Sequence, residues 1–555
     1  MPFCCYRSID MKYLRWFSRV VRPYSLSLAV MMLCHVLLAA CTIAFVYVCK
    51  KLVDIAVAIV AGSGTETAIF PWLSALVCIV VLRIALNSFR SYLQTKTEIR
   101  MKNSLRRRLF DILLRMQSDG GRRHHTGDIL NRIQEDVRVV SSTIAGSLPN
   151  LLGTSLQFLA ALGFLLYLDI RLALAVVVIL PVGLFIGKYI TGKIRHLTLD
   201  IRSGDSKVQS HLQESIQHLT LLQSLEYVGA SAGELDELQY SLYNSELKRT
   251  RFSVISRVFI ALAFQAGYIM AFMWGVFGIS HGTVTYGMMT AFLQLVGQIQ
   301  RPLLEMSSQI PSIIHSTASI DRIMEIESLP QEEDVESVLL GSPAGIRLSD
   351  VSFAYPDSDR KILDRFSFDF VPGSRTAIVG PTGVGKSTLI RLLLSLLRPQ
   401  DGLIEIYESG ADHIPVSAAT RCNLVYVPQG NSLFSGTIRD NLLMGNPEAT
   451  EDQMTVALHT AAADFVFDFP DGLDSRCSEG GAGLSEGQAQ RIAIARALLR
   501  PGSILLLDEF SSALDAETET TLMERLTGSL PDHTMVFITH REKIIDYCTS
   551  TLRIG

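Results

Sequence analysis

Six apolar runs in the first 310 residues constrain most strongly how this chain can fold. They cover residues 25–47, 70–89, 147–168, 172–190, 254–279 and 287–306. A helix needs about 20 predominantly apolar residues to cross the hydrocarbon core of a membrane, and each run has about that length. The first run does not fit a signal peptide, because it is too long and Lys50-Lys51 follow it in place of a cleavage site. The sequence therefore predicts six membrane-spanning helices.

The distribution of basic residues predicts how these helices are oriented. Lys and Arg gather before the first run, between the second and third, and around the link between the fourth and fifth. Cytoplasmic loops carry such an excess of cations, so we expect both termini in the cytoplasm. Residues 1–24 then form a cytoplasmic segment whose aromatic and basic residues have the spacing of a helix on the inner membrane surface. An ordinary basic lead-in to the first span explains the same pattern.

Two of the basic segments between the apolar runs are too long to be turns. Residues 91–146 and 191–253 have helical periodicity and few Gly or Pro residues. We therefore expect long intracellular helical loops, with paired helices that extend into the cytoplasm and with the second turn at residues 213–219. The predicted membrane domain covers residues 25–328.

The last two hundred residues have the composition of a soluble α/β domain. After a linker at 329–345, short apolar strands alternate with helices over residues 346–555. A predicted strand at 375–379 and a predicted helix at 386–397 flank a glycine-rich phosphate-binding loop. In such a loop the backbone N–H groups, the helix N-terminus and the Lys386 ammonium bind phosphates, and the Ser387 hydroxyl binds Mg²⁺. The nucleotide-binding residues of this loop are Gly380, Pro381, Thr382, Gly383, Val384, Gly385, Lys386, Ser387 and Thr388.

A leucine-rich strand that ends in two carboxylates predicts the hydrolytic part of the site. Leu505-Leu506-Leu507 reads as a buried strand that brings Asp508 to a Mg²⁺ ion. The next residue, Glu509, can orient and deprotonate a water molecule in line with the γ-phosphate. Lys386, Mg²⁺ and His540 would hold the negative charge, so electrostatic positioning supplies most of the catalysis.

Between these two motifs stands Leu484-Ser485-Glu486-Gly487-Gln488, which resembles the signature of the ATP-binding cassette (ABC) superfamily. The resemblance covers nearly the whole chain, and it includes a match of Thr126–Val137 to the coupling loops of ABC exporters. It implies that Ser485, Gly487 and Gln488 of one subunit close over ATP bound to another. It further implies an adenine-stacking role for Tyr355, a Mg²⁺- and water-sensing role for Gln429, a dimer-interface role for Asp515 and a switch role for His540. The implied catalytic set is Glu509, His540, Lys386 and Gln429, and the implied metal ligands are Ser387, Gln429 and Asp508.

As a whole, the resemblance implies an exporter-type half-transporter. Because the sequence has no targeting extension before the first span, we expect it in a bacterial inner membrane. Such a protein pairs with a second half-transporter and uses ATP and Mg²⁺ to export an amphiphilic substrate (lipid, drug or peptide) by alternating access. An alternative is an ATP-gated channel or a regulatory, non-pumping subunit of a heterodimer. Importers usually keep their membrane and ATPase parts on separate chains, and the six spans exclude a soluble ABC-type ATPase. The net charge of −4 gives no indication of nucleic-acid binding.

Two departures from the family pattern and one group of polar residues complete the sequence-based expectations. Glu486 replaces the usual glycine of the signature, and we expect function to survive if it is the first helical residue after a Ser485 cap. The family pattern also leads us to expect some helical turns after Gly555. Within the spans, Arg83, Gln294 and Gln298 either face a central cavity and contact the substrate, or they serve as an interfacial arginine and as bridges between helices.

Overall fold

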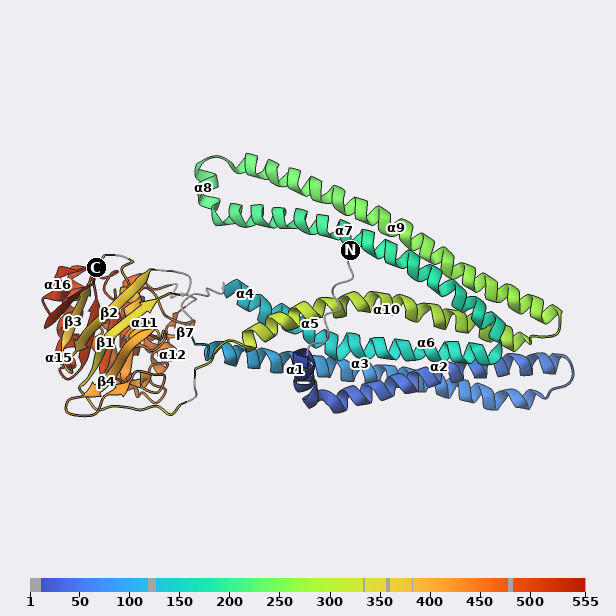
Figure 1. The fold of residues 1–555 in the computed structure, drawn as a ribbon, viewed down its shortest axis with the longest axis horizontal. Helices are drawn as coiled ribbons and strands as arrows, with labels where there is room; N and C mark the ends of the chain where they lie inside the picture. The colour runs from blue at the N-terminus through green and yellow to red at the C-terminus, as the bar shows by residue number, and fades with distance from the viewer. Residues whose placement is uncertain are drawn as a thin grey trace. The chain divides into compact units, whose positions relative to one another are not determined.

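The computed structural model describes residues 11–117, 126–332, 335–355, 360–381, 383–477 and 483–554 (Figure 1). Two compact units make up the chain. The helical unit comprises Met1–Leu109 and Leu130–Met324, and the sheet unit comprises Phe110–Ile129 and Glu325–Gly555.

Long helices form nearly all of the helical unit. Among the described residues, the segments Arg15–Val60, Glu66–Leu114, Gly127–Leu168 and Val228–Ser280 are long and apolar enough to cross a membrane. They contain the first, second, third and fifth predicted spans, and the other two predicted spans lie in helices α7 and α10. The helices are α1 (Met11–Val21), α2 (Ser25–Val60), α3 (Ile69–Leu114), α4 (Thr126–Asn131), α5 (Val137–Ser142), α6 (Leu148–Leu168), α7 (Ile170–Gln217), α8 (Leu219–Ser224), α9 (Val228–Ser280) and α10 (Tyr286–Glu327).

The two long basic segments are helical, as predicted, with one difference in detail. Helices α7 and α9 pack against each other as a pair that the short helix α8 joins at one end (Figure 1). The turn begins at His218, whose φ of −108° and ψ of 26° leave the helical region, and α8 follows it. The short helix therefore lies mostly beyond the predicted turn at 213–219. The other turn, at residues 118–125, lies outside the described residues.

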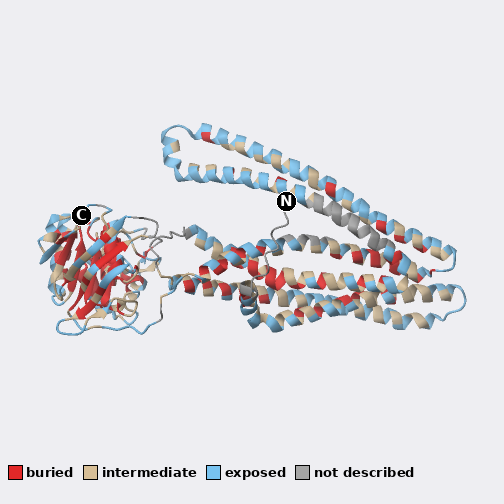
Figure 2. Ribbon diagram, viewed as in Figure 1, coloured by how far each residue is buried: buried red, intermediate tan, exposed pale blue. Residues whose placement is uncertain are grey.

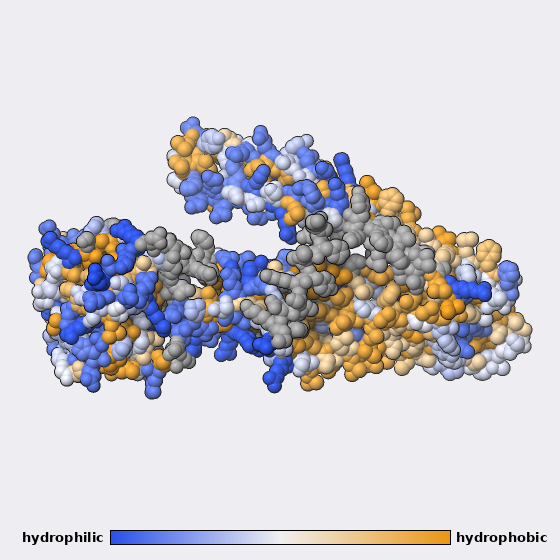
Figure 3. All heavy atoms as spheres, viewed as in Figure 1, coloured by the Kyte–Doolittle hydropathy of each residue, from blue (hydrophilic) through white to orange (hydrophobic). Residues whose placement is uncertain are grey.

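The outer surface of the helical unit is apolar over a wide area. Figure 3 shows hydrophobic residues covering much of the bundle, and Figure 2 shows that most of them are exposed or half-buried rather than enclosed. Val77, Ile84, Leu159 and Phe259, for example, are each more than half exposed. A soluble protein rarely exposes so large an apolar surface, which is suited to contact with lipid.

A buried ion pair joins the end of α10 to the helical segment that follows α4. Asp136 lies in a π-helical turn, Arg132–Asp136, and its side chain is only 3% exposed. Arg322 of α10 donates two hydrogen bonds to this carboxylate, at 2.5 and 2.7 Å. A bidentate pair of this kind fixes the relative register of the two helices.

The sheet unit contains a four-stranded antiparallel sheet with partly exposed strands, a five-stranded parallel sheet whose central strands are buried, and a two-stranded pair (Figure 2). The antiparallel sheet has the order β2-β1-β4-β5, and the parallel sheet has the order β11-β3-β10-β9-β6. The strands are β1 (Ala344–Ala354), β2 (Lys361–Phe370), β3 (Arg375–Val379), β4 (Asp401–Glu408), β5 (Ile414–Pro415), β6 (Leu424–Val427), β7 (Gly436–Thr437), β8 (Arg476–Cys477), β9 (Ile504–Asp508), β10 (Thr534–Ile538) and β11 (Ser550–Arg553). The longer helices are α11 (Lys386–Leu393), α12 (Ile438–Leu443), α13 (Glu451–Thr460), α14 (Glu486–Leu498), α15 (Ala516–Ser529) and α16 (Glu542–Ile545).

The strand predicted at 375–379 is confirmed as β3, whereas the helix predicted at 386–397 ends early, at Leu393. Ser395 has a φ of +53°, which is outside the helical region. The guanidinium of Arg421 donates to the carbonyl oxygens of Leu394 and Ser395, at 2.9 and 3.3 Å. The N–H groups of Ser395 and Leu396 donate to the carbonyl oxygens of Leu392 and Arg391, at 3.0 and 2.9 Å, and this pattern closes the helix at its C-terminal end.

Candidate nucleotide site

The parallel sheet places the predicted catalytic residues at one edge. Strands β3, β9 and β10 are parallel neighbours, with Ile538 paired to both Ile378 and Asp508. Strand β6 continues the sheet beside β9. The carboxyl ends of parallel strands meet at the same edge of a sheet, where open α/β proteins bind their ligands. The segments that follow these four strands carry the phosphate loop, Glu509, His540 and Gln429.

The phosphate loop has a backbone shape that glycine alone accommodates easily. Gly383 and Gly385 have φ values of +83° and +115°. A Cβ atom at Gly385 would collide with the side chain of Ile362, and one at Gly380 with the carbonyl oxygen of Ile554. Because these residues lack side chains, their N–H groups are accessible to phosphate oxygens at the start of α11. The loop is therefore suited to bind the phosphate groups of a nucleoside triphosphate. Thr382 lies outside the described residues.

The ammonium group of Lys386 contacts the backbone of this loop. It donates to the carbonyl oxygen of Gly380 at 2.7 Å, and it lies 2.6 Å from Nε2 of His540. A lysine ammonium has three donors and no acceptor, so Nε2 of His540 is the acceptor when Lys386 donates this bond. Burial lowers the pKa of Lys386, while Glu509 and Asp508 act in the opposite direction. A bound phosphate group would place a negative charge in direct contact with this buried ammonium and so stabilise its charged form.

Ser387 and Asp508 provide two oxygen atoms near Lys386. The Ser387 hydroxyl lies 3.5 Å from Oδ2 of Asp508, and Asp508 is buried with only 4% of its surface exposed. Burial raises the pKa of Asp508, and the nearby Glu509 raises it further. Such a carboxylate is stabilised by a divalent cation, and hydroxyl and carboxylate oxygens are the ligands that Mg²⁺ prefers. These residues therefore fit a Mg²⁺ ion.

Glu509 has an unusual backbone conformation, and hydrogen bonds from its backbone join it to β10 and α14. Its φ of +45° lies in the left-handed region, which is rare for a residue with a side chain. The N–H of Glu509 donates to Ile538 of β10 at 3.0 Å, and its carbonyl oxygen accepts from Gln490 of α14 at 3.2 Å. Strained residues of this kind are concentrated at functional sites, where the surrounding structure keeps them in place.

Two further side chains contact the Glu509 carboxylate. The amide nitrogen of Gln429 donates to Oε2 at 2.5 Å, and Nε2 of His540 lies 3.7 Å from Oε1. The side chain of Glu509 keeps 28% of its surface exposed. It is thus positioned by its neighbours and still accessible to a water molecule, as a general base must be.

The residues of the signature lie at a different place from the phosphate loop. Ser485 caps α14: its hydroxyl accepts from the N–H of Gln488 at 3.2 Å, and the Gln488 side chain accepts from the N–H of Ser485 at 2.9 Å. Gly487 is buried, and a Cβ atom there would lie 2.8 Å from the carbonyl oxygen of Ala513. Glu486 is the first residue of α14 and is exposed, as the sequence led us to expect if Ser485 formed a cap.

Asp515 and Tyr355 also have structural partners in this chain. Asp515 caps α15 by accepting from the N–H groups of Glu517 and Thr518, at 3.1 and 2.9 Å. The hydroxyl of Tyr355 lies 3.0 Å from the Thr388 hydroxyl, which connects it to the first turn of α11. The structure therefore brings Tyr355, Lys386, Ser387, Gln429, Asp508, Glu509 and His540 together around one loop, and it places Ser485, Gly487, Gln488 and Asp515 at the N-terminal ends of α14 and α15.

Sequence reasoning missed two residues that support this site. Gln490 is 1% exposed, and its side chain donates to the carbonyl oxygen of Glu509. The signal in the sequence was a polar residue two positions after the signature, within an otherwise apolar helical segment. Arg541, next to the predicted switch histidine, donates to the carbonyl oxygens of Ser512 and Leu514, at 3.1 and 3.2 Å. It thereby connects the loop of His540 with the segment before Asp515.

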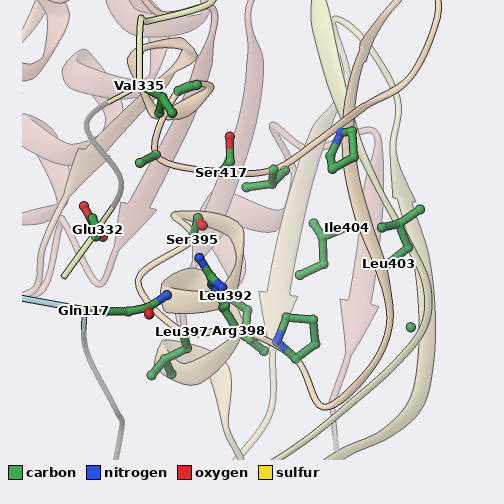
Figure 4. A pocket seen from close by; sticks show the side chains of 16 residues that line it. Gln117, Glu332, Val335, Leu392, Ser395, Leu397, Arg398, Leu403, Ile404 and Ser417 are labelled. Atoms are coloured by element: carbon green, nitrogen blue, oxygen red, sulfur yellow. The ribbon is translucent and has the colours of Figure 1, made fainter. Parts of the chain in front are cut away.

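A separate hollow of about 390 Å³ in the sheet unit contains none of these residues (Figure 4). It lies beyond the far end of α11, where Leu392 and Ser395 meet Glu332 and Gln117. Glu332 forms a bidentate ion pair with Arg421, at 2.6 and 2.9 Å. Its N–H also donates to the carbonyl oxygen of Arg115 at 2.8 Å, and the N–H of Gln117 donates to Pro330 at 2.9 Å. The linker is therefore bound both to the end of α11 and to the segment that follows α3.

In the helical unit, the structure separates the polar residues that the sequence grouped together. Arg83 lines a cavity with Asn87, which lies one helical turn further along α3. Gln294 and Gln298 of α10 are not among the residues that line this cavity. Their buried Oε1 atoms accept no hydrogen bond from any residue that the structure describes. Arg83 therefore lines a cavity of this chain, and a substrate contact by Gln294 and Gln298 stays a prediction.

Comparisons with known proteins agree with this architecture. Residues 28–303 match the family model described as the ABC transporter transmembrane region, and residues 363–512 match the model described as ABC transporter. The chain is 27% identical to the putative multidrug export ATP-binding/permease protein YgaD of Bacillus subtilis, over 97% of this chain and 93% of that protein. It is 30% identical to the uncharacterized ABC transporter ATP-binding protein YknV of Bacillus subtilis, over 83% of this chain and 77% of that protein.

A solved structure supports the same assignment for the whole fold. A bacterial Atm1-family ABC exporter with ATP bound superposes with a TM-score of 0.78 at 26% identity, covering 97% of this chain and 94% of that one. A helical membrane unit joined to a nucleotide-binding sheet unit defines a transport ATPase with both parts on one chain. The chain belongs to the ABC transporter family and is a half-transporter of the exporter type. A half-transporter of this kind dimerises with another half-transporter.

Proposed function

We propose that this half-transporter exports an amphiphilic substrate across a bacterial plasma membrane by alternating access, driven by ATP hydrolysis in a dimer. The observation that carries the proposal is the position of Glu509, which Gln429 and His540 contact at the edge of the sheet beside Lys386. The relatives named as multidrug export proteins support an amphiphilic substrate. The basic inner loops support cytoplasmic termini.

The chemistry of hydrolysis follows from the roles that the side chains can take. The Glu509 carboxylate accepts a proton from a water molecule that the Gln429 side chain helps to orient. Lys386 and the loop N–H groups donate hydrogen bonds to the phosphate oxygens, where negative charge develops, and the His540 imidazole lies beside Lys386. Ser387 and Asp508 would hold a Mg²⁺ ion, with the Gln429 amide oxygen nearby, and this ion would neutralise part of the phosphate charge.

The separate surface of the signature supports a site completed by the second subunit. Ser485 presents the N-terminus of α14 at an exposed position, while Gly487 packs on Ala513. An exposed helix N-terminus attracts phosphate groups. In a dimer this end of α14 would face the nucleotide bound to the other subunit, so ATP binding would draw the two sheet units together. The energy of that closure would then reorient the helical units.

The experiment is reconstitution of the full chain in liposomes with an ATP-regenerating system inside or outside. We expect accumulation of a fluorescent amphiphile that requires ATP on the side of the sheet unit, and its loss in the Glu509→Gln variant. An amphiphile flux that is independent of ATP and equal in the Glu509→Gln variant would overturn export. A flux of ions that ATP opens without hydrolysis would support an ATP-gated channel instead.

A further inference from the structure

A cavity of about 650 Å³ lies among helices α2, α3, α6 and α10 of the helical unit, which run alongside one another (Figure 1). Two arginines and one glutamate line it, together with His35, Asn87 and Asn150. Charged residues are costly within a membrane-spanning bundle, and they usually mark the path of a polar substrate. The charge balance and the partners of these residues therefore indicate what the cavity can bind.

Arg90 is fixed in the wall of this cavity by neutral groups. Its guanidinium donates to the side-chain oxygen atoms of Asn150 and Asn87, at 2.6 and 3.1 Å, and lies 3.4 Å from Nε2 of His35. A Cβ atom at Gly153 would collide with the His35 imidazole, so α6 is shaped to accept this ring. These contacts orient the guanidinium and leave its charge without a carboxylate in ion-pair contact among the described residues.

Arg83 adds a second cation on the same face of α3. It precedes Arg90 by seven residues, or about two helical turns, so both side chains reach the same cavity. Arg83 is exposed, and it forms neither a hydrogen bond nor an ion pair with any side chain that the structure describes. Glu305 of α10 is the one carboxylate among the lining residues, so the two guanidinium groups give the cavity a net positive charge.

We infer that this cavity binds the anionic head group of an amphiphile, a phosphate, sulfate or carboxylate on an apolar tail. Arg83 and Arg90 present forked N–H donors, which match such oxyanions. Phe45, Val80 and Ile84 line the same cavity and provide apolar surface for the start of the tail. The inference names a substrate class for the export proposed above and depends on it only for the direction of transport. Binding itself is measurable without ATP.

The test measures equilibrium binding of three ligands with the same ten-carbon tail to the full chain in nanodiscs of neutral phosphatidylcholine. We expect decyl phosphate to bind at least tenfold more tightly than decyltrimethylammonium and decyl maltoside. Arg83→Gln should weaken decyl phosphate binding about tenfold, Arg83→Lys should weaken it less, and Glu305→Gln should tighten it severalfold. Arg107→Gln, which removes an exposed arginine of α3 outside the cavity, is the matched control and should change nothing.

Equal affinities for the three head groups, or equal effects of Arg83→Gln and Arg107→Gln, would overturn the inference. Nanodiscs that contain phosphatidylglycerol identify the source of the anion. If phosphatidylglycerol competes with decyl phosphate, the ligand is a membrane lipid, and if it does not compete, the ligand is a water-soluble amphiphile. Both results support an anionic site. ATP-driven transport of the cationic ligand alone would contradict this substrate class and leave the proposed export intact. Selective decyl phosphate binding without ATP-driven transport of any ligand would support the site and contradict the export.

Discussion

The side-chain amide of Gln429 donates to the carboxylate of Glu509 at 2.5 Å, and this contact joins the second residue after strand β6 to the residue directly after strand β9. The two strands are adjacent in the parallel sheet. Gln429 is therefore in a position to respond to the charge and orientation of the proposed general base. Any movement of the segment that carries Gln429 also displaces its hydrogen bond to Glu509.

Replacing Glu509 with Gln should abolish hydrolysis while ATP binding persists. The variant keeps the shape of the side chain and removes the proton acceptor, so we expect kcat to fall at least a hundredfold and the affinity for ATP to change less than threefold. Steady-state hydrolysis and equilibrium ATP binding are the measurements. The Glu524→Gln variant, which alters an exposed carboxylate of α15, serves as the control. Hydrolysis near the wild-type rate in Glu509→Gln would show that another group is the base.

The Asp508→Asn variant should be more stable than the wild type in the absence of nucleotide and Mg²⁺. Burial and Glu509 raise the folded-state pKa of Asp508 above its unfolded value, so the folded state disfavours the ionised form. Protonated Asp508 therefore contributes its full share to the free energy of unfolding when the pH is below the pKa of the unfolded state. That contribution is lost as the pH rises through the pKa of the folded state. At pH 7 we expect Asp508→Asn to raise the thermal unfolding midpoint of the sheet unit by about 2–4 °C. This corresponds to an increase of about 1 kcal/mol in the free energy of unfolding.

Calorimetry at several pH values measures this effect in the full chain. The difference between Asp508→Asn and the wild type should shrink as the pH falls below 4, because Asp508 is then protonated in both states. The variant should also lose the extra stability that Mg²⁺ and ATP give to the wild type. Asp532→Asn, at an exposed turn, is a suitable control. A lower midpoint for Asp508→Asn at neutral pH would contradict the assigned direction of the pKa shift.

The sequence predicted much of the nucleotide site because its residues lie next to regular elements. The strand ending at Val379, the glycine-rich loop and the helix beginning at Lys386 are adjacent in the chain, so local pattern determines their geometry. Asp508 follows from the buried apolar strand in the same way. The Ser485 cap was also predictable, since a serine three residues before a glutamine is a common helix start.

The features that the sequence did not predict depend on contacts between distant residues. The helix at Lys386 ends early at the left-handed Ser395, and Arg421, 35 residues after Lys386 in the numbering, donates to the carbonyl groups of Leu394 and Ser395 just beyond that end. The support of Glu509 by Gln490 requires α14 to pack beside β9. Likewise, Gln294 and Gln298 share a helical spacing with Arg301, but they are not among the residues that line the cavity with Arg83. Periodicity identifies a helical face without identifying its neighbour.

Arg541 should act as a positioning residue for His540. Its guanidinium holds the carbonyl oxygens of Ser512 and Leu514 and forms an ion pair with the buried Glu519 at 3.0 Å. A lysine cannot reproduce this fork. We therefore expect Arg541→Lys to lower kcat about tenfold with KM changed less than twofold, measured at least 20 °C below the unfolding midpoint. Arg525→Lys is the matched control, because Arg525 pairs with Asp464 away from the site. Equal kinetic effects of the two variants would indicate a general loss of stability.

Glu486 should weaken ATP binding modestly through its charge. It is the first residue of α14 and is exposed at the helix end that would face the nucleotide of the other subunit. A carboxylate there gains from the helix dipole and repels a triphosphate, each by up to about 1 kcal/mol. We expect Glu486→Gln and Glu486→Gly to lower the KM for ATP by a similar factor of two to five, with kcat little changed. The effect should fade at high salt, because exposed charges are screened. If only the glycine variant changes the KM, backbone flexibility rather than charge is responsible, and if neither does, the carboxylate points away from the nucleotide.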